Sequence, residues 1–476
     1  MDLRRQDRGV ALPTVLILIL VLMLVCGGVF FYISENTNTI VRTKTSYGAM
    51  NIAEAGYNRY LWHLNADPRY FEKSPSELPA DAMVPNKTLE IRDGDVKGYV
   101  YFTVTPPTTT NPDLQIYMTG WVPEDPNNKK TIHARINKRV FTQCVYLSAY
   151  EQTPEGTEVW WGNSQTVSGP VHTNGHLNID GSPVFNGPLT YTTRFSAASA
   201  WHPWTGSSAP SCPTGYPRQV SQFTFPASNS QLVYWAGNDY TFDGTTCICF
   251  TATGIKVRNK GVVGVQVYDY PNKGVIYVKG DVNRAKFDPS VADVFVSGEV
   301  YKSVTVVSDR DIYITGYDPT EPTFSSAAWT GGLTYTGGYS TTNPDANKRM
   351  LGLVAGRNIW ILHNGWPGSG DTTTDVAPDN INIYSALFAL NGCFGFEGTG
   401  SGARKGTITL RGAIVQCFRG IVLDNNSHCG YNKDYAHDPR MSVQTPPHFI
   451  DPVNEGWQVV GWQEWPTPSG IPNYPN

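Results

Sequence analysis

The chain has 476 residues, of which 16% are charged, and its formal net charge at pH 7 is -4. This charge argues against a broad nucleic-acid-binding surface, since phosphate binding requires a basic patch. The 46 glycines, 34 prolines and 26 tyrosines indicate instead an extracellular protein that is rich in β-structure.

The first predicted element is a membrane-spanning helix at residues 10–33. A charged leader, M-D-L-R-R-Q-D-R-G, ends at Gly9, and no charged side chain occurs between Arg8 and Glu35. An apolar run of about 24 residues rises roughly 36 Å as a helix, which is enough to cross a bilayer. The one useful processing point, Gly9, precedes this run, so cleavage there leaves the helix on the mature protein.

The leader, residues 1–9, also predicts the orientation of this helix. Its three arginines outnumber its two aspartates, and positively charged flanks stay in the cytoplasm. We therefore expect a single pass through the inner membrane, with the amino terminus cytoplasmic and the chain after residue 35 outside. A simple membrane anchor that is never processed is the alternative.

The order of leader, glycine and retained apolar helix resembles the prepilins of type IV pili and their minor-pilin and pseudopilin relatives. The resemblance implies that a prepilin peptidase cuts after Gly9 and methylates the new amino terminus, Val10. Major pilins begin with Phe where this chain has Val10, and their fifth mature residue is Glu where this chain has Thr14. That Glu pairs with a neighbouring subunit's amine during assembly. Thr14, preceded by Pro13 in the first turn, therefore favours a minor or tip-located subunit.

The helix is expected to continue beyond the membrane through residues 39–65, which contain no proline. Apolar residues recur there at three- and four-residue spacing, typical of one buried helical face: Ala49, Ile52, Ala53, Gly56, Tyr60, Leu61 and Leu64. The stretch A-M-N-I-A-E-A-G-Y-N-R-Y-L-W-H-L resembles PilX-like pilus assembly proteins. Glu54 and Asn58 are read as a solvated face of this helix rather than as a site.

A small β-domain is predicted at residues 67–143. Residues 97–104, 114–121 and 130–141 alternate as half-buried strands should, with Pro- and Asn-rich turns between them. One long helix packed on a few antiparallel strands is the pilin architecture. A basic stretch within it is read as solvated or packed against neighbouring subunits: Lys129, Lys130, His133, Arg135, Lys138 and Arg139.

Residues 144–476 are predicted to form a large all-β head, which makes the whole chain an α+β protein. Short β-branched and aromatic runs bounded by Gly, Asn or Asp recur from Val167 to Gln416, a rhythm that favours a β-solenoid. Their spacing is irregular, and a Pro/Ser/Trp-rich insertion is expected at about residues 186–270. A β-sandwich or an incomplete β-helix is the alternative.

Several phrases of the head, among them G-V-I-Y-V-K-G-D-V and L-G-L-V-A-G-R-N-I-W-I, resemble an uncharacterised bacterial domain that is often attached to pilin-like amino termini. The resemblance covers most of residues 145–465. It implies a location and a set of partners rather than a chemistry.

The cysteines are consistent with export. Cys26 lies in the membrane helix and seven others lie outside it, where disulfides persist. The candidates for bridges are Cys212, Cys247, Cys249, Cys393, Cys417 and Cys429. The first of these, paired with either of the next two, would staple the insertion, and two of the last three would tie adjacent coils. Because seven is odd, at least one cysteine stays free or pairs elsewhere.

A search for catalytic motifs finds no H-E-x-x-H, G-x-S-x-G, phosphate-binding loop or zinc-ribbon spacing. His172 and His176 are read as surface or turn residues. Asp309 and Asp311 would share a strand face, as paired carboxylates of glycosidases do, but are read as a solvent-facing pair.

A polar loop offers candidate calcium ligands in Asp371, Asp375 and Asp379, although their spacing matches no known loop. No metal, cofactor or catalytic residue is otherwise predicted.

Together these features predict a non-catalytic minor pilin or tip subunit that presents a β-rich head for pilus assembly, adhesion or surface contact. Its expected partners are other pilins through the amino-terminal helix, the prepilin peptidase, the inner membrane before assembly and a glycan or surface ligand stacked on exposed aromatics. Its final location would be the pilus or cell surface. A membrane-anchored β-solenoid enzyme acting on extracellular polysaccharide is the alternative function.

Overall fold

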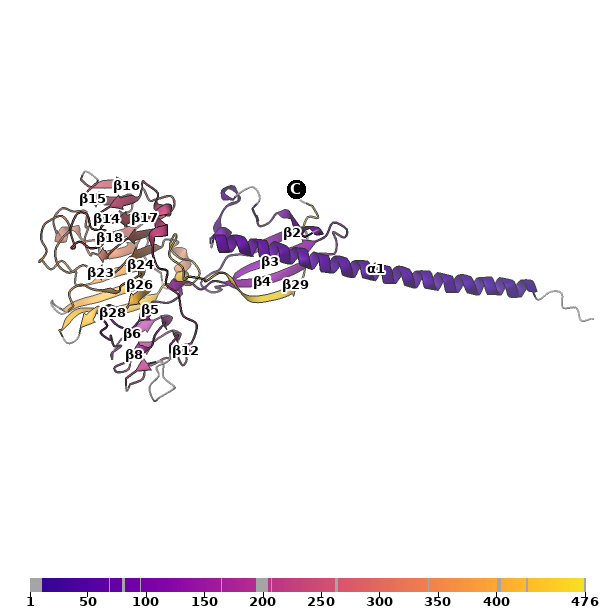
Figure 1. The fold of residues 1–476 in the computed structure, drawn as a ribbon, viewed down its shortest axis with the longest axis horizontal. Helices are drawn as coiled ribbons and strands as arrows, with labels where there is room; N and C mark the ends of the chain where they lie inside the picture. The colour runs from indigo at the N-terminus through magenta and orange to yellow at the C-terminus, as the bar shows by residue number, and fades with distance from the viewer. Residues whose placement is uncertain are drawn as a thin grey trace, which may run out of the picture. The chain divides into compact units, whose positions relative to one another are not determined.

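The computed structural model describes residues 11–67, 69–78, 82–94, 96–163, 165–193, 204–206, 208–261, 264–340, 342–399, 404–424 and 427–474. The chain divides into two compact units, whose elements are labelled in Figure 1. The first unit comprises Met1–Pro107, Asp113–Asn137 and Trp457–Asn476, and the second comprises Thr108–Pro112 and Lys138–Gly456. The second unit is thus an insertion between two segments of the first.

One helix, α1 (Ala11–Ala66), accounts for nearly all of the α-structure in the first unit. Residues 12–44 of α1 are exposed, and this part runs beyond the sheet in Figure 1. The second part buries one face, as the three- and four-residue spacing predicted. The buried apolar residues of that face are Ala49, Ile52, Ala53, Tyr57, Tyr60 and Leu64.

The buried face of α1 packs on a five-stranded antiparallel sheet in the order β1-β2-β3-β4-β29. Its strands are β1 (Thr88–Asp93), β2 (Val96–Thr105), β3 (Leu114–Trp121), β4 (Lys130–Asn137) and β29 (Gln458–Trp465). The three strands expected from the sequence are present, with β4 ending at Asn137 before a 3-10 turn, Phe141–Gln143. The α+β class is therefore confirmed.

The helix approaches β3 closely because Gly120 has no side chain. A Cβ atom at Gly120 would lie 2.4 Å from the Ala53 nitrogen and 2.5 Å from the Ala49 oxygen of α1. Any larger residue there would push the helix off the sheet. This contact brings the part of α1 around Ala49 and Ala53 directly onto β3.

The carboxyl-terminal segment returns to the first unit, which corrects the expectation that the head would extend to Asn476. Strand β29 pairs antiparallel with β4, and the Trp457 nitrogen donates a 2.9 Å hydrogen bond to Asn65 Oδ1 at the end of α1. The Trp121 indole nitrogen donates a 2.9 Å bond to the Asn473 oxygen. The local strand pattern could not reveal this pairing because it joins segments more than 300 residues apart.

The second unit is built mostly from parallel strands in three ladders. The first ladder contains, in spatial order, β13 (Thr241–Asp243), β17 (Val275–Lys279), β19 (Val304–Ser308), β22 (Leu351–Ala355), β24 (Ile381–Ala389), β26 (Arg404–Phe418), β5 (Tyr146–Tyr150), β7 (Val171–Thr173), β10 (Leu189–Tyr191) and β12 (Arg218–Gln219). The second contains β14 (Thr246–Thr251), β18 (Val294–Val300), β20 (Ile312–Ile314), β23 (Ile359–Ile361) and β25 (Phe394–Phe396).

The third ladder shares strands with the other two. It runs through β18, β21 (Gly332–Tyr335), β24, β26, β28 (Cys429–His437), β6 (Thr166–Ser168) and β9 (Val184–Phe185). The remaining strands are β15 (Gly254–Asn259), β16 (Gln266–Tyr268), β27 (Leu423–Asp424), β8 (Leu177–Asn178) and β11 (Trp204–Thr205), and a short helix is α2 (Val233–Ala236).

The core between the ladders consists of apolar columns in register. Pairing across successive strands of the first ladder aligns one such column: Ile276, Val306, Leu353, Leu387, Ile414, Tyr146, Val171 and Leu189. The column passes without interruption from β26 to β5, so the chain enters the ladder in its middle. Stacked strands of this kind bury each apolar residue against the strands above and below.

The stretch at about residues 186–270, expected as an insertion, supplies strands at both ends of the first ladder. It contributes β10 and β12 at one end and β13 at the other. The segment between these ends buries Phe223, Leu232 and Ala236 against the outer side of the ladder. This crossing connects the two halves of the second unit.

Candidate functional site

The first candidate site is the exposed apolar half of α1. Pro13 and Thr14 lie in its first turns and are exposed, whereas Gly9 and Val10 lie outside the described residues. The helix is long and apolar enough to cross a membrane, and the apolar part is unburied within the chain. In water such a surface is unfavourable, so lipid or other helices are its natural surroundings.

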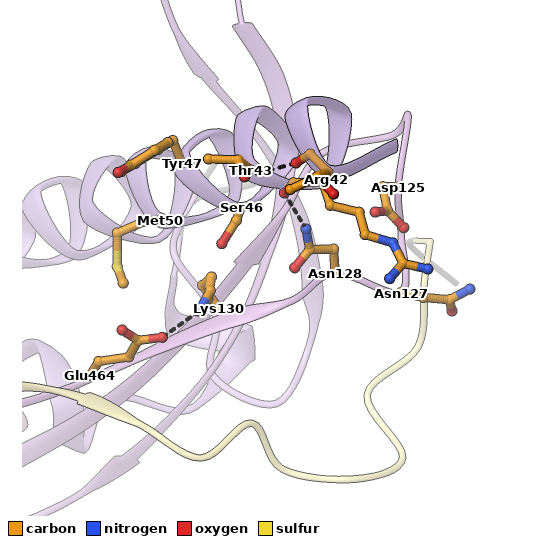
Figure 2. A pocket seen from close by; sticks show the side chains of 11 residues that line it. Arg42, Thr43, Ser46, Tyr47, Met50, Asp125, Asn127, Asn128, Lys130 and Glu464 are labelled. Carbon is orange, nitrogen blue, oxygen red and sulfur yellow. Dashed lines mark hydrogen bonds and ion pairs between the residues drawn. The ribbon is translucent and has the colours of Figure 1, made fainter. Parts of the chain in front are cut away.

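A hollow of about 840 Å³ lies in the first unit, immediately beyond this apolar half. Figure 2 shows Arg42 extending toward Asp125 and Asn127 at one end, and Lys130 beside Glu464 at the other. The remaining lining residues are Thr39, Thr43, Ser46, Tyr47, Met50 and Asn128. The hollow is therefore polar, with Met50 and Tyr47 as its larger apolar surfaces.

Hydrogen bonds fix the turn that forms one wall of the hollow. Asn128 Nδ2 donates to the Arg42 oxygen at 3.0 Å and to Thr45 Oγ1 at 2.9 Å. Thr45 Oγ1 donates to Asp125 Oδ2 at 3.3 Å. These three hydrogen bonds join α1 to the turn, so the position of this wall relative to the helix is fixed. Arg42 and Asp125 lie far apart in the sequence, and no local pattern indicated that they line the same hollow.

The predicted basic stretch spans the two units, and in each of them ion pairs neutralise most of its charges. In the first unit, Lys130 pairs with Glu464 at 2.6 Å, and Arg135 pairs with Asp113 at 3.5 Å. The His133 ring stacks on Tyr117 with 4.2 Å between centroids. In the second unit, Lys138 pairs with Asp451 at 2.6 Å and Arg139 with Glu455 at 2.8 Å. The stretch therefore does not form a basic surface.

The structure joins none of the cysteines that it describes by a disulfide, so none of the expected bridges is present. The ladder order explains why Cys212 and the C-I-C pair do not meet. Cys212 follows a bridge from Ser211 to Val184 of β9, whereas Cys247 and Cys249 lie in β14 at the opposite end of the unit. Burial raises the pKa of the Cys247, Cys249 and Cys393 thiols to about 12, which disfavours the reactive thiolate.

The candidate calcium ligands do not converge. Asp371 Oδ1 accepts hydrogen bonds from the Thr373 and Thr374 nitrogens of its own loop. The Thr374 side chain, followed by these two backbone groups, lowers the pKa of the Asp371 carboxyl to about 2. Asp375 instead lies 2.9 Å from Lys405 Nζ. No group of three or more His, Cys, Asp or Glu suited to a metal ion occurs among the residues described. The calcium prediction is therefore wrong for this loop.

Asp309 and Asp311 are also used separately. Asp309 accepts from the Tyr277 hydroxyl, and the buried Asp311 accepts from the Asn358 nitrogen at 2.9 Å. The reading of a solvent-facing pair is wrong for Asp311, because its carboxylate ties two neighbouring strands. His172 is likewise buried rather than at the surface, and burial lowers its pKa to about 4.

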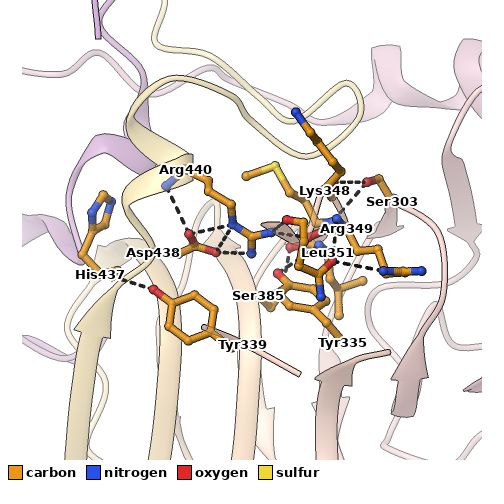
Figure 3. A network of polar contacts seen from close by, with 12 residues as sticks. Ser303, Tyr335, Tyr339, Lys348, Arg349, Leu351, Ser385, His437, Asp438 and Arg440 are labelled. Atoms are coloured by element: carbon orange, nitrogen blue, oxygen red, sulfur yellow. Dashed lines mark hydrogen bonds and ion pairs between the residues drawn. The ribbon is translucent and has the colours of Figure 1, made fainter. Parts of the chain in front are cut away.

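Two buried ion-pair networks in the second unit were not anticipated. Arg419 Nη1 lies 2.7 Å from Glu151 Oε2, and both side chains are 2% exposed. Figure 3 shows the second network, in which Arg440 Nη2 lies 2.5 Å from Asp438 Oδ2 and Tyr339 donates to the His437 oxygen. The Arg440 guanidinium also lies 5.3 Å from the Tyr335 ring centroid. With their polar groups bonded internally, these networks hold strands together rather than form an open reactive centre.

Three comparisons relate the chain to known proteins. A family described as "Domain of unknown function (DUF4900)" matches residues 125–193, which overlaps the end of the first unit and the start of the second. No curated protein matches the chain. The crystal structure of the competence-associated pilin ComZ from Thermus thermophilus aligns at 11% identity over 88% of this chain and 97% of that chain, with a TM-score of 0.27. A TM-score this low does not establish a common fold.

Proposed function

We propose that this protein is a pilin-like subunit of the minor-pilin class, anchored by α1 and presenting the second unit as a head. The observation that carries the proposal is the division of α1 into two parts. Its first part is exposed and apolar. Its second part packs on a five-stranded antiparallel sheet and shares a hydrophobic core with it. One helix thus joins a membrane or filament core to a folded domain.

The proposed maturation follows from the leader. The amino terminus begins in the cytoplasm, the prepilin peptidase cuts after Gly9, and Val10 becomes the methylated first residue. The helix then moves from the inner membrane into a filament, where other pilin helices replace lipid around the same apolar surface. Both surroundings suit a helix surface without charges.

The proposed head is a non-catalytic β-solenoid that binds a surface or assists assembly. Three parallel ladders around one apolar core support the solenoid form. The carboxylates singled out in the sequence support the non-catalytic role, because they are bonded to separate partners. Exposed aromatic residues such as Tyr150, Tyr216 and Tyr234 offer surfaces for a glycan or protein ligand.

The anchoring role is tested by placing a charge in the apolar half of α1. Leu20→Arg costs about 2–3 kcal/mol at a bilayer centre, so we expect less membrane-bound protein and less protein in sheared pili. Val41→Arg, an exposed position of the same helix outside the apolar run, is the matched control. Equal recovery of both variants in membranes and pili would contradict the proposal.

The maturation is tested by mass spectrometry of the mature amino terminus. We expect the wild-type chain to begin at a methylated Val10 and Gly9→Val to retain its leader, because the branched side chain blocks cleavage. Gly9→Ala should be processed in part. An intact leader on the wild-type protein in cells with an active prepilin peptidase would leave a simple anchor as the better description.

A further inference from the structure

A second hollow, of about 390 Å³, lies in the second unit at the carboxyl ends of three neighbouring parallel strands. Tyr150 is the last residue of β5, residues 174–176 follow β7, and Thr193 follows β10. Parallel strands leave a sheet at the same edge, so the turns after them gather on one side. This strand-end hollow is therefore lined by turns rather than by the core.

Hydrogen bonds hold the walls of the strand-end hollow in place. Asn174 Nδ2 donates to the Phe223 oxygen at 2.8 Å, and Asn174 Oδ1 accepts from the Phe223 nitrogen at 2.9 Å. This pair of bonds fixes Gln222, the residue before Phe223, beside the turn after β7. Thr193 Oγ1 donates to the Asn174 oxygen at 2.9 Å. Because the walls are already ordered, a ligand loses little binding energy to ordering them.

One wall of the strand-end hollow is aromatic. Tyr150 is 53% exposed, and its ring stacks on Phe418 with 5.4 Å between centroids and 24° between planes. Phe418 covers one face of the ring, so the exposed surface belongs to the other face and the edge. An aromatic surface of this kind packs against other apolar surfaces, including the C–H groups on one face of a pyranose ring.

The strand-end hollow also presents three planar polar side chains, those of Gln152, Glu158 and Gln222. Among the described residues, none forms a hydrogen bond or an ion pair with these side chains. Gln152 and Glu158 face each other across an isolated antiparallel bridge, which places their side chains next to one another. An amide both donates and accepts, and a carboxylate accepts at two oxygens. Together they complement a ligand that carries neighbouring hydroxyl groups.

The charge of the strand-end hollow selects against acidic ligands. No lysine or arginine occurs among the described residues that line it, and Glu158 is an exposed carboxylate. The second lining carboxylate, Glu151, is buried and lies 2.7 Å from Arg419 Nη1. An acidic sugar, a phosphate or a nucleic acid would therefore meet a carboxylate without a cation to balance it. An extended peptide would need a sheet edge or an apolar groove, and Tyr150 is the one large apolar side chain among the described lining residues.

We propose that the strand-end hollow binds a neutral hexose unit of a glycan, with one face of the sugar on Tyr150 and neighbouring hydroxyls on Gln152, Glu158 and Gln222. The proposal rests on the role of the second unit as a binding head given above, and it adds the site and the class of ligand. The volume of the hollow falls in the range of about 300–1,000 Å³ that is typical of small-molecule sites. An uncharged sugar satisfies the three polar side chains without repulsion from Glu158.

The experiment uses the full-length protein purified in detergent and applied to a glycan array. The array carries neutral hexose chains, their sialylated, uronic-acid and sulfated counterparts, and unglycosylated peptides. We expect binding to the neutral glycans at least several-fold above binding to the acidic ones. Tyr150→Ala and Gln152→Ala should each reduce this binding by up to about tenfold, as the loss of one such contact predicts.

Two conservative variants separate the ring from the charge. Tyr150→Phe keeps the aromatic face and should retain binding of neutral glycans. Glu158→Gln keeps a hydrogen-bond acceptor but removes the charge, so it should raise the binding of acidic glycans. Tyr234→Ala is the matched control, because Tyr234 is a tyrosine of the same unit that is 69% exposed and does not line the hollow. It should leave glycan binding unchanged.

Thermal unfolding of each variant should match that of the wild type, and Gln152→Ala keeps the test valid if Tyr150→Ala does not fold. Equal binding of neutral and acidic glycans, binding to peptides alone, or an equal loss in Tyr234→Ala would overturn the proposal. Absence of all glycan binding, with the protein still recovered in membranes and sheared pili, would reject this inference and leave the pilin-like role intact. Neutral-glycan binding that is lost in Gln152→Ala, in a protein that never enters pili, would support the hollow and reject the pilin-like role.

Discussion

Among the described residues, fully buried ion pairs occur in the second unit, whereas the ion pairs of the first unit are at least partly exposed. In the first unit Lys97 and Glu90 lie 2.9 Å apart with 44% and 41% of their side chains exposed. In the second unit Arg440 and Asp438 are 4% and 0% exposed. Exposed pairs contribute little to stability, whereas removing one partner of a buried pair leaves an uncompensated charge.

The two ways of building a sheet explain the difference. In the first unit, consecutive strands pair antiparallel, so the backbone N–H and C=O groups of the strands hydrogen-bond to one another. In the second unit the chain turns between ladders and leaves carbonyl groups inside the protein. Arg419 donates to the Val159 oxygen at 3.1 Å, and Arg440 donates to the Arg349 oxygen at 3.1 Å. A buried arginine thus satisfies these carbonyls, and its carboxylate partner balances the charge.

The largest expected effect is that of Glu151→Ala. Glu151 accepts hydrogen bonds from Arg419, the Trp161 indole and the Tyr146 hydroxyl, so the substitution leaves a buried guanidinium unpaired. We expect the free energy of unfolding of the second unit to fall by about 3–5 kcal/mol. Denaturant unfolding followed by hydrogen exchange should show the loss in that unit alone. Glu155→Ala, at an exposed position of the same unit, is the control. If Glu151→Ala lowers the free energy of unfolding no more than this control does, buried ion pairs do not stabilise the second unit more than exposed pairs stabilise the first.

The next effect concerns Lys433, a partly buried lysine 5.5 Å from the Trp161 ring. Burial, and then the Arg419 charge, lower its pKa to about 7. Between pH 7 and 10.5 the unfolded chain holds a proton that the folded chain lacks, so stability rises with pH by up to about 1.4 kcal/mol per unit. Lys433→Met should remove this slope and stabilise the protein at neutral pH. The slope should persist in Lys348→Met, which alters an exposed lysine.

The smallest effect is expected for Arg135→Gln in the first unit. Arg135 lies 3.5 Å from Asp113, with 49% of its side chain exposed. Its removal should change the free energy of unfolding by about 0–1 kcal/mol, and high salt should reduce even that difference. A loss of unfolding free energy comparable to that of Glu151→Ala would show that exposed ion pairs stabilise the first unit as strongly as buried pairs stabilise the second.

The sequence by itself determined the elements whose signals are local. The length of the apolar run after Gly9 indicated a helix long enough to span a membrane. The spacing from Ala49 to Leu64 indicated the buried face of its continuation, because helical contacts repeat every three or four residues. Alternation within residues 114–121 likewise marked β3. Each of these patterns is complete within a few turns of chain, so no distant partner was needed to read it.

Only the tertiary structure decided which distant segments meet. The pairing of β29 with β4, the passage of the core column from Ile414 to Tyr146, and the separation of Cys212 from Cys247 all depend on ladder order. The hollow lined by Arg42 and Asp125 likewise forms only where α1 packs on the sheet, close to Gly120. Such contacts leave no periodic signal, because the two partners lie far apart in the chain and each fits several alternative neighbours.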